Sequence, residues 1–238
     1  MRILIVGGTS GIGLALARHY HGAGHAVTVC GRDLARLPAD AGVQAVALDV
    51  TDRTAVAEAM AGFGAAGLDL LIVAAGFYFN HRRHPLDEAT TLRMLQTNVG
   101  GLAQLFELAA ATMLPRKAGH LVAISSVAGL LQDHPGASLY AATKRSVLSL
   151  CDSYRTALAP FGIAVTAIVP GYVDTAKLRA LNGGDARHRP FIVSEAEAVT
   201  QIVRAIAGRR ARCVFPWQMR WLVAALNRLP PTLLRWRR

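Results

Sequence analysis

The sequence predicts an α/β fold in which a doubly wound, parallel sheet of seven strands carries helices on both faces. Short runs of β-branched residues and leucine recur along the chain, and segments of helical character separate them. The first of these runs leads directly into a glycine-rich turn. Strands that alternate with helices of this length need right-handed crossovers, which make the strands parallel. We expect one domain over residues 1–216, followed by a basic, apolar C-terminal extension over residues 217–238.

The composition is that of a folded protein with a sizeable core. Hydrophobic residues make up 53% of the 238 residues, and charged residues make up 17%. The first six residues run into the glycine turn, which leaves no room for a signal peptide. No apolar run reaches the roughly 18 residues that cross a bilayer. Cys30, Cys151 and Cys213 are widely spaced, so we expect a reducing cytoplasm, no disulfide framework and no metal site.

The formal charge of +11 is concentrated near the C-terminus. After Glu197 the chain contains no acidic residue and nine arginines, from Arg204 to Arg238. This end of the chain either attracts a negatively charged partner or is only a basic, soluble surface. We expect no nucleic acid among the partners.

A strand at residues 2–6, a glycine turn and a helical segment from residue 14 form the context of a phosphate-binding loop. Glycine lets the backbone approach a pyrophosphate, and the N-terminus of the helix supplies free N–H groups. The spacing is Gly-x3-Gly-x-Gly. The residues predicted to hold a dinucleotide here are Gly7, Thr9, Ser10, Gly11, Ile12 and Gly13.

The end of the second strand, residues 25–30, indicates which nicotinamide cofactor binds. An acidic residue there would bond a free ribose 2′-hydroxyl, whereas an arginine accommodates a 2′-phosphate. The chain has Gly31, Arg32 and then Asp33. Asp33 lies at about the distance that suits NAD, but it is better explained as the N-cap of a short helix over residues 34–37. Arg32 therefore favours NADP.

Further strands at residues 43–48 and 68–73 flank a helix over residues 52–63. Asp49-Val50 and Ala74-Ala75-Gly76 follow these strands, at the edge of the sheet where a cofactor lies. The loop over residues 77–84 is aromatic and basic. Its histidines, His81 and His84, lack a third ligand at a suitable spacing, so we favour a role at the substrate rim or in solvent.

A long helix is expected over residues 86–114, although it contains Asn98, Gly100 and Gly101. These residue types are unfavourable inside a helix. Such exceptions are candidates for a functional site. A glycine pair that serves only close packing is the alternative.

Tyr140 and Lys144 are four residues apart in a helix that runs to about residue 159, so their side chains share one face. A phenol with a pKa of about 10 is a poor base, and a neighbouring cation lowers that value. We therefore expect Lys144 to lower the pKa of Tyr140, which acts as proton donor and acceptor. Surface helices also carry such pairs by chance. The strands at residues 119–124 and 163–169 bring Ser125, Ser126 and the segment after Val169 to the same edge.

Together these residues resemble the short-chain dehydrogenase/reductase family, in its short single-domain form, over residues 2–215. The resemblance implies a Rossmann fold and an oxidoreductase that uses NADP (NADPH). It implies that Tyr140 protonates a carbonyl oxygen as hydride arrives, Ser126 bonds that oxygen, Lys144 holds the nicotinamide ribose, and Asn98 supports a water relay. Ser126 is preferred to Ser125 because of its spacing to Gly129. Cofactor contacts are implied for Arg32, Asp49, Val50, Ala75, Gly76, Tyr140, Lys144, Pro170, Gly171, Val173 and Thr175.

The sequence departs from the family pattern at two places. Ala74 stands where the family usually has asparagine, which removes a side-chain hydrogen bond but keeps the backbone contact. The stretch from Gly129 to Tyr140 is one residue longer than in many members.

The expected function is hydride transfer between NADP(H) and a carbonyl or secondary alcohol substrate, apolar or bulky. The alternative is a non-catalytic NADP-binding sensor or scaffold. The resemblance also implies a homo-dimer or tetramer, which pairs through the helices that carry Asn98 and Tyr140. Residues 102–114 and 146–158 read as apolar on more than one helical face, as such burial requires.

The C-terminal part is less specific. Residues 175–191 are expected to form a lid over the substrate, Ser194 and Glu197 a capping box, and residues 212–215 a last strand. A helix over residues 217–229 carries two tryptophans, a broad aliphatic face and arginines. This composition suits a peripheral membrane anchor, a subunit contact or a roof over the substrate pocket.

Overall fold

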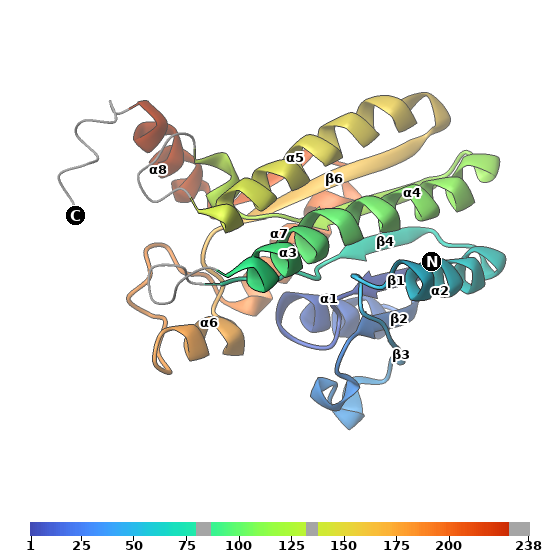
Figure 1. Cartoon of the computed structure of the whole chain (residues 1–238), viewed down its shortest axis with the longest axis horizontal. Helices are drawn as coiled ribbons and strands as arrows, with labels where there is room; N and C mark the ends of the chain where they lie inside the picture. The colour runs from blue at the N-terminus through green and yellow to red at the C-terminus, as the bar shows by residue number, and fades with distance from the viewer. Residues whose placement is uncertain (80–86, 132–137, 229–238) are drawn as a thin grey trace.

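The computed structural model describes residues 1–79, 87–131 and 138–228. In these ranges seven parallel strands form one sheet in the order β3-β2-β1-β4-β5-β6-β7. The predicted fold class is confirmed (Figure 1). The strands are β1 (Arg2–Val6), β2 (Ala26–Gly31), β3 (Gln44–Ala47), β4 (Leu70–Val73), β5 (Gly119–Ile124), β6 (Ile163–Pro170) and β7 (Arg212–Phe215).

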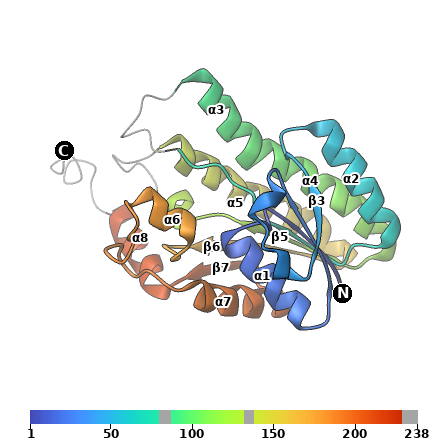
Figure 2. The ribbon, with the colours of Figure 1, turned by 90° about the horizontal axis from the view of Figure 1, so that it is seen from below.

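Helices cover both faces of the sheet (Figure 2). One face carries α1 (Gly11–Gly22) and α7 (Glu195–Ala207), and the other carries α2 (Arg53–Ala66), α4 (Gly101–Met113) and α5 (Leu139–Leu158). Successive side chains of a strand point to opposite faces. In β1, Ile3 and Ile5 therefore pack toward α1, whereas Leu4 and Val6 enter the core beneath α4 and α5. Burial on both faces explains why the central strands β1, β4, β5 and β6 read as continuous apolar runs, whereas β3 at the edge is exposed.

The strand order reverses between β1 and β4, which lie side by side although 63 residues of the chain separate Val6 from Leu70. Helices leave the two strands toward opposite faces, so a crevice opens at their carboxyl ends. The glycine turn after β1 and the Ala74-Ala75-Gly76 segment after β4 meet at this point. The fold therefore places the predicted cofactor residues at its topological switch point.

The long helix expected over residues 86–114 is present, but in the described part of the chain it is not a regular α-helix throughout. A first helix, α3 (Glu88–Leu95), passes through a π-helical turn at Gln96–Gly100 into α4. A Cβ atom built on Gly101 would lie 2.7 Å from the carbonyl oxygen of Val50, so this glycine serves close packing. Asn98 lies in the π-helical turn and is buried. Close packing therefore explains Gly101, whereas Asn98 stays a candidate for the functional site.

Local capping signals in the sequence are confirmed. Asp33 caps a 3-10 turn at Leu34–Arg36, because its carboxylate accepts a hydrogen bond from the backbone N–H of Ala35 at 3.1 Å. Ser194 and Glu197 form the predicted capping box of α7. The remaining short 3-10 turns of the described chain are at Ala39–Ala41, Leu114–Arg116, Val127–Leu130 and Ala159–Phe161.

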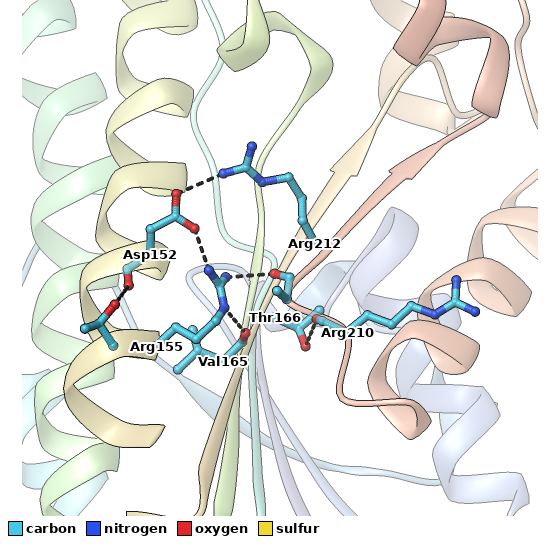
Figure 3. Close-up of polar contacts among 8 residues, drawn as sticks. Asp152, Arg155, Val165, Thr166, Arg210 and Arg212 are labelled. Atoms are coloured by element: carbon cyan, nitrogen blue, oxygen red, sulfur yellow. Dashed lines mark hydrogen bonds and ion pairs between the residues drawn. The ribbon is translucent and has the colours of Figure 1, made fainter. Parts of the chain in front are cut away.

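Hydrogen bonds from arginine hold the last strand beside α5 (Figure 3). Arg155 donates to the backbone carbonyls of Val165 at 3.0 Å and of Ala211 at 2.8 Å. Asp152 pairs with both Arg155 and Arg212. These ion pairs are partly exposed and contribute little by themselves. The bonds to carbonyl groups satisfy backbone acceptors at the edge of the sheet and bind β7 to the body.

The C-terminal helix α8 (Trp217–Arg228) packs on the body of the protein. Met219 and Val223 are buried, and the Asn227 side chain donates to the carbonyl oxygen of Leu130 at 2.8 Å. Trp217 and Trp221 are 67% exposed on the outer side. The predicted helix extends one residue further, to residue 229, which lies outside the described residues. None of the described helices combines the length and hydropathy that a membrane crossing requires.

Candidate active site

The glycine turn after β1 is shaped by close approach of backbone segments. A Cβ atom on Gly7 would lie 2.4 Å from the amide nitrogen of Ala75, and one on Gly13 would lie 2.2 Å from the carbonyl oxygen of Gly7. Ser10 occupies the N-cap of α1, yet its side chain makes no capping hydrogen bond. The first N–H groups of α1 are therefore not satisfied by a side-chain cap, which is the arrangement that binds a phosphate.

The end of β2 leaves little space for a side chain at residue 31 while Thr9 keeps its position. A Cβ atom on Gly31 would lie 2.6 Å from Cγ2 of Thr9 and 2.7 Å from its hydroxyl oxygen. Arg32 follows on the surface. The carboxylate of Asp33 accepts hydrogen bonds from the N–H of Ala35 at 3.1 Å and from the side chain of Arg36 at 3.2 Å. Among Gly31, Arg32 and Asp33, only Arg32 has a side chain that makes no hydrogen bond or ion pair within this turn.

The neighbouring serines after β5 have different partners. Ser125 is buried, and its hydroxyl donates to the backbone carbonyl oxygen of Lys144 at 2.8 Å. Ser126 lies beside Tyr140, close enough for its hydroxyl to lower the pKa of the phenol, and its oxygen accepts from the N–H of Ala128 at 3.2 Å. The structure therefore brings Ser126, rather than Ser125, to the tyrosine.

Tyr140 and Lys144 lie together, but the expected effect on the tyrosine pKa is wrong for this structure. Burial raises the pKa of Tyr140 to about 12, although the hydrogen bond from Ser126 lowers it; the nearby Tyr78 raises it further. The Lys144 ammonium is 5.8 Å from the centre of the Tyr140 ring and donates to the carbonyl oxygen of Ile124 at 3.0 Å. Desolvation of the phenolate is the largest effect on this pKa and outweighs the lowering by Ser126.

Lys144 itself is buried without a carboxylate partner among the described residues. Burial, followed by repulsion from Lys177, lowers the pKa of its ammonium group to about 8. Tyr140 and Lys144 thus have pKa values displaced in opposite directions. Such a pair is typical of sites that transfer protons.

Asn98 holds the segment after β4. Its side-chain oxygen accepts from the N–H of Phe77 at 2.7 Å, and its nitrogen donates to the carbonyl oxygen of Phe77 at 2.9 Å. The same nitrogen donates to the hydroxyl of Thr143 at 3.0 Å, and Thr143 donates to the carbonyl oxygen of Tyr140 at 2.8 Å. Asn98 therefore joins the edge of the sheet to the helix that carries Tyr140.

The remaining predicted cofactor residues also lie near the carboxyl ends of the strands. Asp49 accepts hydrogen bonds from the backbone N–H and the hydroxyl of Thr51, at 3.0 and 2.9 Å, and Val50 is buried beside Gly101. Pro170 ends β6, and the N–H of Gly171 donates to the carbonyl oxygen of Phe215 at 2.7 Å. Val173 is buried and bridges to Val193.

Thr175 caps the short helix α6 (Ala176–Leu181) and lies over the glycine turn. Its methyl carbon is 3.7 Å from where a Cβ atom on Gly11 would stand. The expected lid segment thus begins directly above the predicted phosphate site. Within the described residues no group of metal-binding side chains is present, and His81 and His84 lie outside these residues.

Sequence reasoning missed three residues that the fold brings to the site. Thr143 relays the contact of Asn98 to α5, Tyr78 packs edge-on against Tyr140 with ring centres 4.9 Å apart, and Lys177 reaches the segment after β4. The position of Thr143 one turn after Tyr140 was a usable signal. Nothing local distinguishes Tyr78 or Lys177 from other exposed side chains.

A family model described as short chain dehydrogenase matches residues 1–186 of the chain. The chain belongs to the short-chain dehydrogenase/reductase family. This short-chain dehydrogenase is therefore an oxidoreductase, and its family binds a nicotinamide cofactor. The predicted Rossmann fold and family resemblance are both confirmed.

Relatives and solved structures extend the match over nearly the whole chain. An uncharacterized oxidoreductase of Myxococcus xanthus is 34% identical, over 91% of this chain and 87% of its own. Another, of Mycobacterium tuberculosis, is 32% identical over 98% and 96%. A short-chain dehydrogenase from Sphingobium yanoikuyae, solved in complex with NADPH, has a TM-score of 0.81 and 25% identity over 94% and 92% of the two chains.

The site of this short-chain dehydrogenase fits a dinucleotide. The close contacts of Gly7 and Gly13 keep the turn thin, and the N-terminus of α1 lacks a side-chain cap. A pyrophosphate can approach the backbone at such a turn because no Cβ atom projects from it. Tyr140 and Lys144 lie beside the same crevice, across Gly76.

Proposed function

We propose that this short-chain dehydrogenase is an NADP-dependent carbonyl reductase or, in the reverse direction, an alcohol dehydrogenase. One observation carries the proposal: Ser126, from the turn after β5, meets Tyr140 and Lys144 of α5 beside the segment that contacts the glycine turn. Bound NADPH would supply a hydride to the substrate carbon. The residues of the chain then have to bind the carbonyl group and deliver a proton to its oxygen.

Tyr140 suits the role of proton donor because burial raises its pKa to about 12, which keeps the phenol protonated at neutral pH. It would give this proton to the carbonyl oxygen, while the Ser126 hydroxyl donates a hydrogen bond to the same atom. The Lys144 ammonium would offset the negative charge that develops on the phenol oxygen. Its pKa of about 8 makes it a better proton source than an ordinary lysine.

Asn98 would act as a positioning residue in this scheme. All the hydrogen bonds found for its side chain go to Phe77 and Thr143. The water relay implied by the family resemblance would therefore depend on how Asn98 holds these segments. Its effect on Tyr140 passes through the hydroxyl of Thr143.

Preference for NADP is supported by the end of β2. Thr9 fills the space beside Gly31, and Asp33 is engaged by Ala35 and Arg36. Arg32 can therefore pair with a 2′-phosphate, and no acidic side chain stands ready for a 2′-hydroxyl. The NADPH in the related Sphingobium yanoikuyae structure agrees with this assignment.

An apolar or bulky substrate is supported by the side chains around Tyr140. Tyr78 packs against the Tyr140 ring and is 38% exposed. Helix α8 lies over the turn that follows Ser126, where Asn227 binds the carbonyl oxygen of Leu130. The C-terminal segment is thus a neighbour of the proposed pocket. The membrane contact that its composition suggested gains no support from the comparisons, and neither does a non-catalytic sensor or scaffold.

The test is a screen of ketones and secondary alcohols, with NADPH oxidation or NADP reduction as the readout. Tyr140→Phe removes the proton donor and keeps the ring, so turnover should fall by about 10²–10⁴-fold while NADPH still binds. Tyr154→Phe is a matched control on α5, because the Tyr154 hydroxyl makes only a long 3.4 Å contact to the carbonyl oxygen of Ala103. Undiminished turnover by Tyr140→Phe would contradict the proposed function.

A homo-dimer or tetramer remains our proposal for the assembly. The second apolar face expected on α5 is wrong: its outer positions are small and mostly polar, including Ala142, Ser146, Ser149, Ser153 and Ala157. Small side chains nevertheless allow another helix to approach closely. Light scattering should return a multiple of the 25.3 kDa chain mass, and a monomer at micromolar concentration would contradict the proposal.

A further inference from the structure

Lys177 lies on α6, outside the set of residues considered so far for the cofactor. Its ammonium group reaches across the crevice to the carbonyl oxygen of Gly76, at 3.5 Å. The base of α6 rests on the glycine turn, because Thr175 packs over Gly11. Lys177 therefore stands between the segment after β4 and the N-terminus of α1.

Other cations lie on both sides of Lys177. On one side, the ammonium group of Lys144 is 3.4 Å from where a Cβ atom on Gly76 would stand. Arg36 and Arg32 also act on Lys177: burial, followed by the charges of these two arginines, lowers the pKa of Lys177. Lys177 in turn lowers the pKa of Lys144. The row of positive groups runs along the crevice from the end of β2 to the catalytic helix.

Lys177 and Arg32 have no carboxylate partner within ion-pair distance in the part of the chain that the structure describes. Arg36 pairs with Asp33, and Arg179 on the same helix pairs with Asp174 at 3.0 Å. Like charges held together without counter-charges favour binding of an anion. The N-terminus of α1, which has no side-chain cap, lies below Lys177 and favours an anion at the same place.

We propose that Lys177 binds the pyrophosphate of the dinucleotide cofactor, as a cation that α6 contributes from above the glycine turn. This inference rests on the proposed function and adds one residue to its site. Arg32 would take the 2′-phosphate, and Lys177 the group that NADPH and NADH share. Arg32 would therefore determine the preference for NADPH over NADH, and Lys177 would increase the affinity for both cofactors.

Calorimetric titration of the purified full-length protein with NADPH and with NADH tests this assignment. Lys177→Gln should weaken both dinucleotides by the same factor, about tenfold or more, because a charge-assisted hydrogen bond is lost from a group common to both. Lys177→Arg keeps the positive charge and should retain most of the affinity. Lys177→Gln should also show a weaker dependence of affinity on salt concentration than the wild type, since one ionic contact is absent.

Arg179→Gln is the matched control. It removes one positive charge from the same helix, at a side chain that pairs with Asp174, and should leave both affinities nearly unchanged. A loss confined to NADPH would place Lys177 at the 2′-phosphate and overturn the proposal, and so would unchanged binding by Lys177→Gln. A wild-type protein that binds neither dinucleotide would overturn the proposed function itself. Tyr140→Phe distinguishes the two further, because it should reduce turnover without this loss of affinity.

Discussion

The hydroxyl of Ser125 donates a 2.8 Å hydrogen bond to the backbone carbonyl oxygen of Lys144, inside the protein. This bond holds the turn after β5 against the middle of α5. Because Ser125 is committed to the backbone, the adjacent Ser126 is the serine whose hydroxyl reaches Tyr140. One structural bond thereby determines which of two neighbouring, chemically identical side chains can face a substrate.

The serine pair gives a direct test. Ser126→Ala removes a donor to the carbonyl oxygen and should reduce kcat about a hundredfold or more. Ser125→Ala removes a buried hydrogen bond that the carbonyl of Lys144 accepts in addition to its helical bond, and should lower the free energy of unfolding by about 0.5–1.5 kcal/mol. Its effect on kcat should be much smaller. Urea unfolding and turnover, measured on both variants, separate the two effects. If Ser125→Ala loses turnover at unchanged stability, Ser125 and not Ser126 is the serine that bonds the substrate oxygen.

Cofactor choice is tested at the end of β2. Arg32→Ala should weaken NADPH by about 1.5–3 kcal/mol, or roughly 10- to 150-fold, with little change for NADH. Asp33→Asn is the companion variant, since Asp33 caps the turn at Leu34–Arg36 and should not contribute to NADH binding. Titration of each variant with both dinucleotides measures these losses. If Asp33→Asn weakens the binding of NADH alone, Asp33 is the residue that bonds the ribose 2′-hydroxyl.

His120 should make stability depend on pH. Its Nε2 lies 2.8 Å from the hydroxyl of Thr166, which donates to the carbonyl oxygen of Arg210 at 2.7 Å. Nε2–H is therefore the donor, and a neutral ring satisfies the contact. Burial, with a smaller effect from the charge of Arg209, lowers the pKa of His120 from 6.5 to about 4.

The sign follows from proton binding. Between pH 6.5 and 4 the unfolded chain binds a proton at His120 that the folded protein excludes, so stability falls as pH falls through this window. The free energy at stake is about 3 kcal/mol. His120→Gln should flatten urea-unfolding free energies between about pH 7 and pH 4.5 relative to wild type. His188→Gln removes an exposed histidine as a control, and equal slopes in wild type and His120→Gln would refute the prediction.

Several elements were predictable because their causes are local. The alternation of apolar strands with helical segments gave the sheet, and turn chemistry placed the glycine loop before α1. Asp33 was assigned as a cap and the Ser194–Glu197 pair as a capping box, since both depend on residues at most three positions apart. Short-range hydrogen-bonding geometry is present in the order of the residues themselves.

Other features depended on how distant segments meet. Asn98 indicates an irregular helix in the sequence. Its hydrogen bonds with Phe77 and Thr143, which are 21 and 45 positions away, could not be predicted from neighbouring residues. The i,i+4 spacing placed Lys144 beside Tyr140 and wrongly indicated a lowered phenol pKa, because desolvation belongs to the whole environment and not to the pair.

Sequence alone therefore determined the family, the order of strands and helices, and the residue types that gather at the crevice. Tertiary structure decided which serine faces Tyr140, in which direction the pKa of Tyr140 shifts, and that Lys177 reaches Gly76, 101 residues earlier in the chain. Periodicity and turn signals are set by neighbouring residues, whereas burial and Coulomb interactions depend on distances that only the packed chain establishes.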